Sequence, residues 1–414
     1  METIKKHLRN FLKKHHKLRI LVRKIYSRYK ERRYRRIASK ISVDEKMVLF
    51  ETFMGRQYGC NPKAIYEYMI SDSKFDDYNL VWTLIDPAKA KDHAALNRAE
   101  IVEMKSKKYF ETCARAKYII TNSNLDNRVV KKPGQVFIQT WHGTPLKRLR
   151  CDIEAEKGNV NNTLEEIRFK NDVDVVRYDY FISPSAYATE KFASAFNLKK
   201  LGKENILIET GYPRNDLMFN FDESYAETIR ESLGINKNKK VILYAPTFRD
   251  NQHDGAGYVY DTHLDFNRLH QALGDEYVVL FRAHYFVANQ FDFDKYAGFV
   301  YDVSSLDDIT PLYTISDLLI TDYSSVFFDY ANLRRPIILY MYDLKEYAEG
   351  IRGFYIDINE LPGPIIENEE ELPAAIKEAL SGNFRPNEKY AKFNEKYNYL
   401  DDGNASRRVV EIAL

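Results

Sequence analysis

Cysteine is scarce in this sequence of 414 residues, and the three present, Cys60, Cys113 and Cys151, are widely spaced. They form no CxxC pair and no zinc-like grouping, which argues against a disulfide framework and indicates a reduced, cytosolic protein. A GxGxxG fingerprint and a GxxxxGKS/T loop are also missing, so neither a dinucleotide site nor a P-loop is supported. No run of 18 apolar residues occurs, and we therefore expect no segment that spans a bilayer.

Positive charge is concentrated at the start of the chain, although the net charge is only +2. Residues 1–40 carry 16 Lys and Arg against two Glu, whereas the remainder has 46 basic and 58 acidic residues. Apolar residues recur in this segment at steps of three and four, which predicts a helix with one apolar stripe between basic faces. The stripe consists of Ile4, Leu8, Phe11, Leu12, Leu18, Val22, Ile25 and Tyr29.

Such a basic amphipathic helix is typical of a segment that lies in the plane of an anionic membrane surface. Two alternatives remain open, a basic arm for nucleic acid and a solvated helix docked on its own domain. An unstructured nucleic-acid arm does not need the stripe, so we expect an anionic membrane surface and no nucleic acid as partner. The segment lacks a long apolar core and a small-residue cleavage site, which argues against a secretory signal.

Strand-like and helical stretches alternate from about residue 46, which is the pattern of βαβ units and a parallel sheet. A second series follows Gly211–Asp216 and a helix near Glu223–Leu233. Runs that contain the expected strands lie at 47–53, 79–85, 118–122, 136–142 and 179–185, and then at 241–248, 277–284, 298–304, 317–325 and 336–342. Because the chain is too long for one ordinary core, we predict two α/β domains. The predicted units are 1–40 (basic helix), 45–220 and 235–400 (the two domains) and 401–414 (a short helix).

His142 lies just past the predicted strand Val136–Thr140. Ligands of open α/β sheets bind at the carboxyl ends of the strands, and Gly143 with Pro145 allows a tight turn there. A neutral imidazole beside cations suits the transfer of a phosphorylated group, because it supplies a base where positive charge attracts phosphate oxygens. The alternative is a histidine that only satisfies a loop carbonyl. The cations that follow are Lys147, Arg148 and Arg150.

A second site is predicted where the strand Leu318–Thr321 meets a helix. Asp322, Ser324 and Ser325 occupy the turn and the helix start, where free N–H groups and serine hydroxyls can bind a phosphate. The alternative is that these residues are ordinary helix caps. The turn ends a strand of the second domain, as His142 ends one of the first.

Two further strand ends of the second domain carry basic residues. Arg282 and His284 lie two apart in an extended segment and point to one side, and Tyr244–Asp250 adds Arg249. An ion pair with a carboxylate is the alternative for the first pair. Asp292-Phe-Asp294 looks like a metal-binding DxD, but its aromatic and polar surroundings predict a surface loop. We therefore expect no metal and no cofactor.

The motifs WHGTPLKRL, TGYPRND, YAPTFRD, RAH and SDLLITDYSSVFFDY, in this order, resemble the CDP-glycerol glycerophosphotransferase family. That family builds teichoic-acid and related capsule-type polyol-phosphate polymers. The resemblance covers nearly the whole chain after residue 46 and implies a GT-B fold, with two Rossmann-like domains facing a cleft. It also implies an acceptor on the first domain, CDP-polyol on the second, and peripheral attachment to the cytoplasmic face of the membrane. This chain resembles the shorter members, which have a single catalytic unit.

The resemblance implies that His142 deprotonates the acceptor hydroxyl, while Arg282 and His284 form a second basic pair and Ser324 and Ser325 bind phosphate. In the reaction that this implies, the hydroxyl of a lipid-linked saccharide or polyol-phosphate acceptor would attack the phosphorus that bears glycerol, and CMP would leave without a covalent enzyme intermediate. The matching motifs give further candidates for substrate binding: Gly143, Thr144, Lys147, Pro213, Arg214, Thr247, Arg249, Asp322 and Asp329.

Three other functions compete with glycerol-phosphate transfer from CDP-glycerol. CDP-ribitol could be the donor, since ribitol differs from glycerol only by CHOH units. A GT-B glycosyltransferase would use a nucleotide sugar and release a nucleoside diphosphate. A non-catalytic binding protein on a degenerate GT-B body is disfavoured, because degenerate sites rarely keep every strand-end His, Arg and Ser. Assembly into a homo-oligomer is left open.

Overall fold

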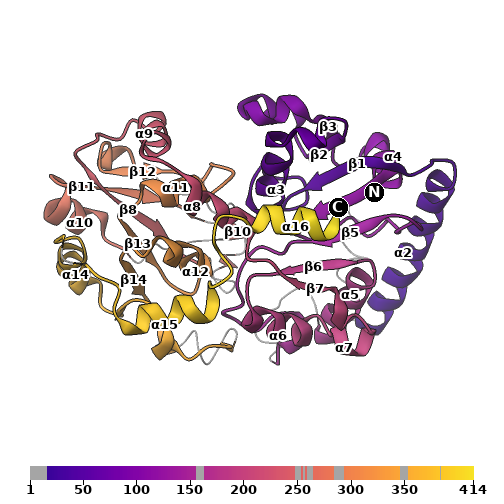
Figure 1. The fold of residues 1–414 in the computed structure, drawn as a ribbon. Coiled ribbons are helices and arrows are strands. Elements are labelled where there is room, and N and C mark those ends of the chain that lie inside the picture. The colour runs from indigo at the N-terminus through magenta and orange to yellow at the C-terminus, as the bar shows by residue number, and fades with distance from the viewer. Residues whose placement is uncertain are drawn as a thin grey trace.

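The computed structural model describes residues 16–154, 163–247, 264–283, 293–345, 353–382 and 384–414, with two short strands at 253–254 and 257–258. Within these ranges the chain forms two α/β domains that lie side by side (Figure 1). Each domain is built on a parallel sheet with helices around it. The predicted fold class, two Rossmann-like domains, is confirmed.

The sheet of the first domain has seven parallel strands in the order β3-β2-β1-β4-β5-β6-β7. Its strands are largely buried apolar runs, because helices cover the faces of a parallel sheet. The strands are β1 (Asp44–Glu51), β2 (Asn79–Leu84), β3 (Glu100–Glu103), β4 (Ala116–Thr121), β5 (Val136–Gln139), β6 (Tyr180–Ser183) and β7 (Leu207–Glu209). The helices are α3 (Cys60–Ser71), α4 (Lys107–Arg115), α5 (Leu164–Val175), α6 (Ala186–Ala195) and α7 (Leu198–Leu201).

The sheet of the second domain has six parallel strands in the order β12-β11-β8-β13-β14-β15. Alternate residues of β8 enter two apolar clusters, Val241 and Leu243 on one face and Ile242 and Tyr244 on the other. The strands are β8 (Lys240–Ala245), β11 (Tyr277–Phe281), β12 (Val300–Asp302), β13 (Leu318–Thr321), β14 (Ile337–Tyr340) and β15 (Ile365–Ile366), and β9 (His253–Asp254) pairs separately with β10 (Gly257–Tyr258). The helices are α10 (Phe266–Leu273), α11 (Thr310–Ile315), α12 (Val326–Tyr330), α14 (Leu372–Ala379) and α15 (Glu388–Tyr397).

The chain crosses between the domains twice. The first crossing contains α8 (Leu217–Asn220) and α9 (Glu223–Ser232), near the predicted boundary. The second leads to α16 (Ala405–Ala413), the helix predicted in 401–414, which returns to the first domain and lies beside α3 (Figure 1). Its first turn is held by Asp216, whose carboxylate accepts hydrogen bonds of 2.8 Å from the backbone N–H groups of Ala405 and Ser406.

The basic segment forms helix α2 (His16–Ala38), which runs along the outer edge of the first domain (Figure 1). Ile20, Tyr34 and Ala38 are buried against the domain, and Arg19 and Arg23 form ion pairs with Glu166 of α5. The docked-helix alternative therefore holds for this part. The predicted stripe lies on the opposite side of the helix and is exposed, from 40% at Leu18 and 42% at Val22 to 60% at Ile25 and 62% at Tyr29. Its other members, Ile4, Leu8, Phe11 and Leu12, lie outside the described residues.

No helix within the described ranges is both long and apolar enough to cross a membrane.

Candidate active site at the domain junction

His142 lies at the carboxyl edge of the first sheet, just after β5, with Nδ1 2.7 Å from the carbonyl oxygen of Asn122. A carbonyl only accepts, so Nδ1 carries the proton and Nε2 is the basic nitrogen. Burial lowers the pKa of His142 to about 4, and the charges of Arg214 and Arg150 act in the same direction. The imidazole is therefore neutral near pH 7. The alternative of a histidine that satisfies a loop carbonyl therefore holds for Nδ1, while Nε2 can still accept a proton.

Aromatic rings enclose the imidazole of His142 on two sides. The Trp141 ring stacks on it at a centroid distance of 4.3 Å, and the Phe53 ring meets it edge-on at 5.5 Å. Phe53 comes from the loop after β1, where its N–H donates to Oδ1 of Asn122 at 2.8 Å. Loops that follow three neighbouring strands thus shape the surroundings of this histidine.

Gly143 brings the histidine loop against the serine turn of the second domain. A Cβ atom at Gly143 would lie 2.5 Å from Oγ and 3.2 Å from Cβ of Ser325, too close for any side chain without displacement of the serine. The neighbouring Thr144 is buried. The two strand ends that the sequence analysis predicted as separate sites, after β5 and after β13, are therefore in contact across the domain junction.

Asp322, a candidate for substrate binding, shapes this turn. Its carboxylate accepts a 2.8 Å hydrogen bond from the backbone N–H of Thr247, which joins the ends of β13 and β8. Ser324 Oγ lies 3.5 Å from the N–H of Val326, while Ser325 makes no side-chain capping bond to α12. The helix-cap alternative therefore does not account for Ser325, whose hydroxyl faces Gly143.

Arg282 is placed differently from expectation. Its guanidinium donates to the backbone carbonyls of Val303 and Leu306, both at 2.9 Å, so it holds the loop after β12. Burial lowers its pKa, while the charges of Asp308 and Asp307 oppose that shift. These bonds use two of the five N–H donors of the guanidinium. His284 and Arg249 lie outside the described residues.

Arg214 and Asp329 were expected to contact substrate, and the structure instead pairs them with each other. The guanidinium of Arg214 lies 2.8 Å and 2.9 Å from the two carboxylate oxygens of Asp329, with both side chains buried. Arg214 lies in the first crossing, beside the buried Pro213, and Asp329 lies on α12. The pair therefore joins the domains, because each charge is excluded from water and matched by the other.

The cations after His142 also have protein partners. Lys147 forms an antiparallel bridge with Phe354 of the second domain. Arg148 pairs with Glu154. Arg150 donates to Oδ1 of Asn124 at 2.6 Å and lies over the Phe196 ring at 4.6 Å. The side chains of Arg148 and Arg150 thus have protein partners, Lys147 joins the domains through its backbone, and Arg150 influences His142 through its charge.

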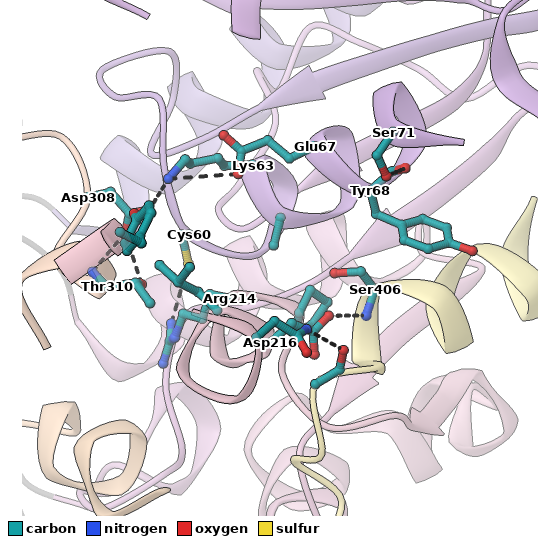
Figure 2. Close-up of a pocket in the computed structure, with 16 residues that line it drawn as sticks. Cys60, Lys63, Glu67, Tyr68, Ser71, Arg214, Asp216, Asp308, Thr310 and Ser406 are labelled. Carbon is teal, nitrogen blue, oxygen red and sulfur yellow. Dashed lines mark hydrogen bonds and ion pairs between the residues drawn. The ribbon is translucent and has the colours of Figure 1, made fainter. Parts of the chain in front are cut away.

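Two acidic residues that the sequence analysis missed lie at the same junction. Asp308 pairs with Lys63 of α3 at 2.8 Å, and Asp307 accepts from His93 at 3.0 Å. Only the path of the chain reveals them, since a DD dipeptide in a turn is ordinarily solvated. Lys63, Arg214 and Asp308 line a cavity of about 340 Å³ between the domains, opposite Tyr68 and Ser406 (Figure 2).

Within the described ranges, no group of three or more His, Cys, Asp and Glu side chains could hold a metal ion. Asp294 of the DxD-like sequence begins a short 3-10 helix, Asp294–Tyr296. Asp292 lies outside the described residues.

Two Rossmann-like domains that meet at a neutral histidine and a serine turn have the architecture of the GT-B class. The sequence profile of the CDP-Glycerol:Poly(glycerophosphate) glycerophosphotransferase family matches residues 33–414, and the chain belongs to this family.

Similar proteins include two named teichoic acid poly(glycerol phosphate) polymerase. The one from Bacillus subtilis (strain 168) is 42% identical over 90% of this chain, which spans about half (49%) of that protein. The one from Bacillus spizizenii is 40% identical over 92% of this chain and 94% of its own length. A structure of the wall teichoic acid polymerase TagF soaked with CDPG superposes with a TM-score of 0.84 at 34% identity, covering 97% of both chains.

Proposed function

We propose that this protein transfers glycerol phosphate from CDP-glycerol to a hydroxyl of a membrane lipid-linked acceptor and releases CMP, in the synthesis of a teichoic-acid-type polymer. The observation that carries the proposal is the contact of the histidine loop with the serine turn at Gly143 and Ser325. This contact supports the proposal because it joins the loop of a neutral histidine in one domain to the serine turn of the other. Membership of the glycerophosphotransferase family supports the same substrate class.

In the proposed reaction, an acceptor hydroxyl attacks the phosphorus that bears glycerol. Nε2 of His142 takes the hydroxyl proton, the bond from that phosphorus to the bridging oxygen of CMP breaks, and CMP leaves with the electron pair. The imidazole then releases its proton to solvent. The neutral state of His142 suits this role, because a base must be unprotonated before the attack.

The developing negative charge is proposed to lie against the Ser324 and Ser325 turn, whose hydroxyls and backbone N–H groups can donate to phosphate oxygens. His284 is proposed as a second basic group at the same phosphates. Asp322 and Thr247 support the turn through their hydrogen bond. Arg282 is proposed to act through the loop that its guanidinium holds.

Attachment to an anionic membrane surface is proposed through the exposed stripe of α2. Apolar side chains flanked by Lys and Arg can insert among headgroups while the opposite side of the helix stays docked on the domain. This geometry would hold the junction close to a lipid-linked acceptor at the cytoplasmic face.

The proposal is tested by incubation with CDP-glycerol or CDP-ribitol and a synthetic lipid-linked disaccharide. We expect CMP release with CDP-glycerol and a product heavier by one or more glycerol phosphate units. Release of CMP only with CDP-ribitol would assign the other donor, and no CMP with either would refute polyol-phosphate transfer. A nucleotide-sugar arm that yields a nucleoside diphosphate would instead identify a glycosyltransferase.

A further inference from the structure

The backbone immediately before the proposed base is held in an unfavourable conformation. Trp141 has a φ of 51°, in the left-handed region that a bulky aromatic residue rarely adopts. Such a conformation persists only where the surroundings determine it, and it is often found beside functional groups. The next residue is His142, so whatever holds Trp141 also sets the position of the imidazole.

Two buried side-chain amides hold Trp141 from its two sides. Oε1 of Gln139 accepts a hydrogen bond from the Trp141 N–H at 2.9 Å. Nδ2 of Asn61 donates to the Trp141 carbonyl at 3.1 Å and to the Thr140 carbonyl at 3.0 Å. Asn61 and Gln139 are both fully buried. Gln139 lies on β5 itself, whereas Asn61, from the first turn of α3, holds Trp141 from outside this strand and its loop.

A third bond connects Asn61 to the domain junction. Its Oδ1 accepts from the backbone N–H of Arg214 at 3.1 Å, and the Arg214 guanidinium pairs with Asp329. Asp329 lies on α12, directly after the serine turn. A continuous set of contacts thus runs from the loop of His142, through Asn61 and Arg214, to the helix that follows the proposed phosphate site.

We propose that Asn61 is a positioning residue for the transfer reaction: it fixes the backbone of Thr140 and Trp141 so that His142 keeps its place in the loop whose Gly143 meets Ser325. The inference rests on the proposed function, because it assigns Asn61 a role only through His142. A rigid tie is needed here because a base displaced by about 1 Å can lose about 100-fold in rate.

Gln135 provides a matched control within the same domain. Its Nε2 donates to two backbone carbonyls, those of Cys113 at 2.7 Å and Ala116 at 2.6 Å, and its side chain is buried. Like Asn61, Gln135 is a buried amide that donates to two backbone carbonyls. These carbonyls lie at or before the start of β4, at the edge of the sheet opposite to His142. A purely structural role for Asn61 predicts the same consequences for both residues.

The experiment compares Asn61→Ala with Gln135→Ala by CMP release from CDP-glycerol and by thermal unfolding. We expect Asn61→Ala to lower kcat by about 10-fold to 100-fold with KM for CDP-glycerol changed less than about threefold. Gln135→Ala should lower the unfolding temperature comparably and keep kcat within about twofold. An intact kcat in Asn61→Ala, or an equal loss in Gln135→Ala, would overturn the proposal.

Two additions keep the test decisive. Asn61→Ser retains one hydrogen-bond donor and should recover part of kcat. If Asn61→Ala does not fold, Asn61→Ser takes its place in the comparison with Gln135→Ala. Nitrogen-15 spectra of labelled histidine report the tautomer and titration of His142 directly. We expect them to change in the Asn61 variant and not in the Gln135 variant, and unchanged spectra would contradict the proposal. Absence of CMP release by the wild-type protein would refute the proposed function alone, because the spectra do not depend on substrate.

Discussion

A single hydrogen bond from Nδ1 of His142 to the Asn122 carbonyl fixes which nitrogen of the histidine can act as a base. Replacement of this side chain should therefore remove proton transfer and leave the donor site in place. We expect His142→Ala to lower kcat by about 10²–10⁴-fold, the range ascribed to general-base catalysis, while the Kd for CDP-glycerol changes little. Turnover by CMP release and binding by calorimetry check this. His270→Ala, an exposed histidine on α10, is the control and should be fully active.

The pH profile should report the buried surroundings of His142. Because its pKa is lowered to about 4, the neutral base persists into acid, and we expect the acid limb of kcat/KM near pH 4 instead of near 6.5. Arg214 and Arg150 contribute to the shift through their positive charge. For stability, the unfolded chain binds more protons at this group between pH 4 and 6.5, so its contribution rises with pH across that window and is constant above it.

Phe53 offers a check on this interpretation of the pH profile. Its ring covers the imidazole edge, and its φ of 45° is one that glycine adopts easily. Phe53→Gly should admit water and move the acid limb toward 6.5. An acid limb near 6.5 already in the wild-type protein would contradict a buried neutral base.

The two long sides of helix α2 have different surroundings. One side docks on the domain through Ile20, Tyr34 and the Glu166 ion pairs, and the other exposes the apolar stripe. We expect the double variant Val22→Glu/Ile25→Glu to lose cosedimentation with vesicles that contain anionic phosphatidylglycerol, by about 10-fold or more, since charges replace two inserting side chains. Ile85→Glu and Ile412→Glu change exposed residues elsewhere and serve as controls. Undiminished cosedimentation of the α2 variant would exclude the stripe as the membrane contact.

At the level of elements, the sequence predicted most strands because buried parallel strands are continuous apolar runs, as in Val241–Tyr244. His142 and Ser325 could be found because they follow such runs at the edge where ligands bind. Asn61 could not, since it lies inside the first turn of α3 and its partners at 140, 141 and 214 are distant in the chain. The ion pair of Arg214 with Asp329 could not be predicted for the same reason. Each residue was recognised from its motif, but only the fold shows that they contact each other.

The buried pair of Arg214 and Asp329 joins the two domains of the whole molecule. Removal of one partner leaves an uncompensated buried charge, so we expect Asp329→Ala to lower the free energy of unfolding by about 3–5 kcal/mol. The double variant Arg214→Met/Asp329→Leu removes both charges and should lose clearly less. Urea unfolding monitored by tryptophan fluorescence measures both variants. An equal loss in the single and double variants would mean that the pair is not coupled.

The return of α16 to the first domain has a consequence for how the chain folds during synthesis. Val409, Val410 and Ala413 complete an apolar cluster with Ile65, Tyr66 and Met69 of α3, although the whole second domain separates them in the chain. During synthesis the first domain therefore emerges from the ribosome with part of its α3 surface uncovered. Helix α16 covers that surface only after the second domain has emerged. Transiently exposed apolar surface of this kind favours aggregation and chaperone binding. The folding of the first domain consequently depends on synthesis of the second, and a fragment that ends near residue 220 would carry an incomplete core.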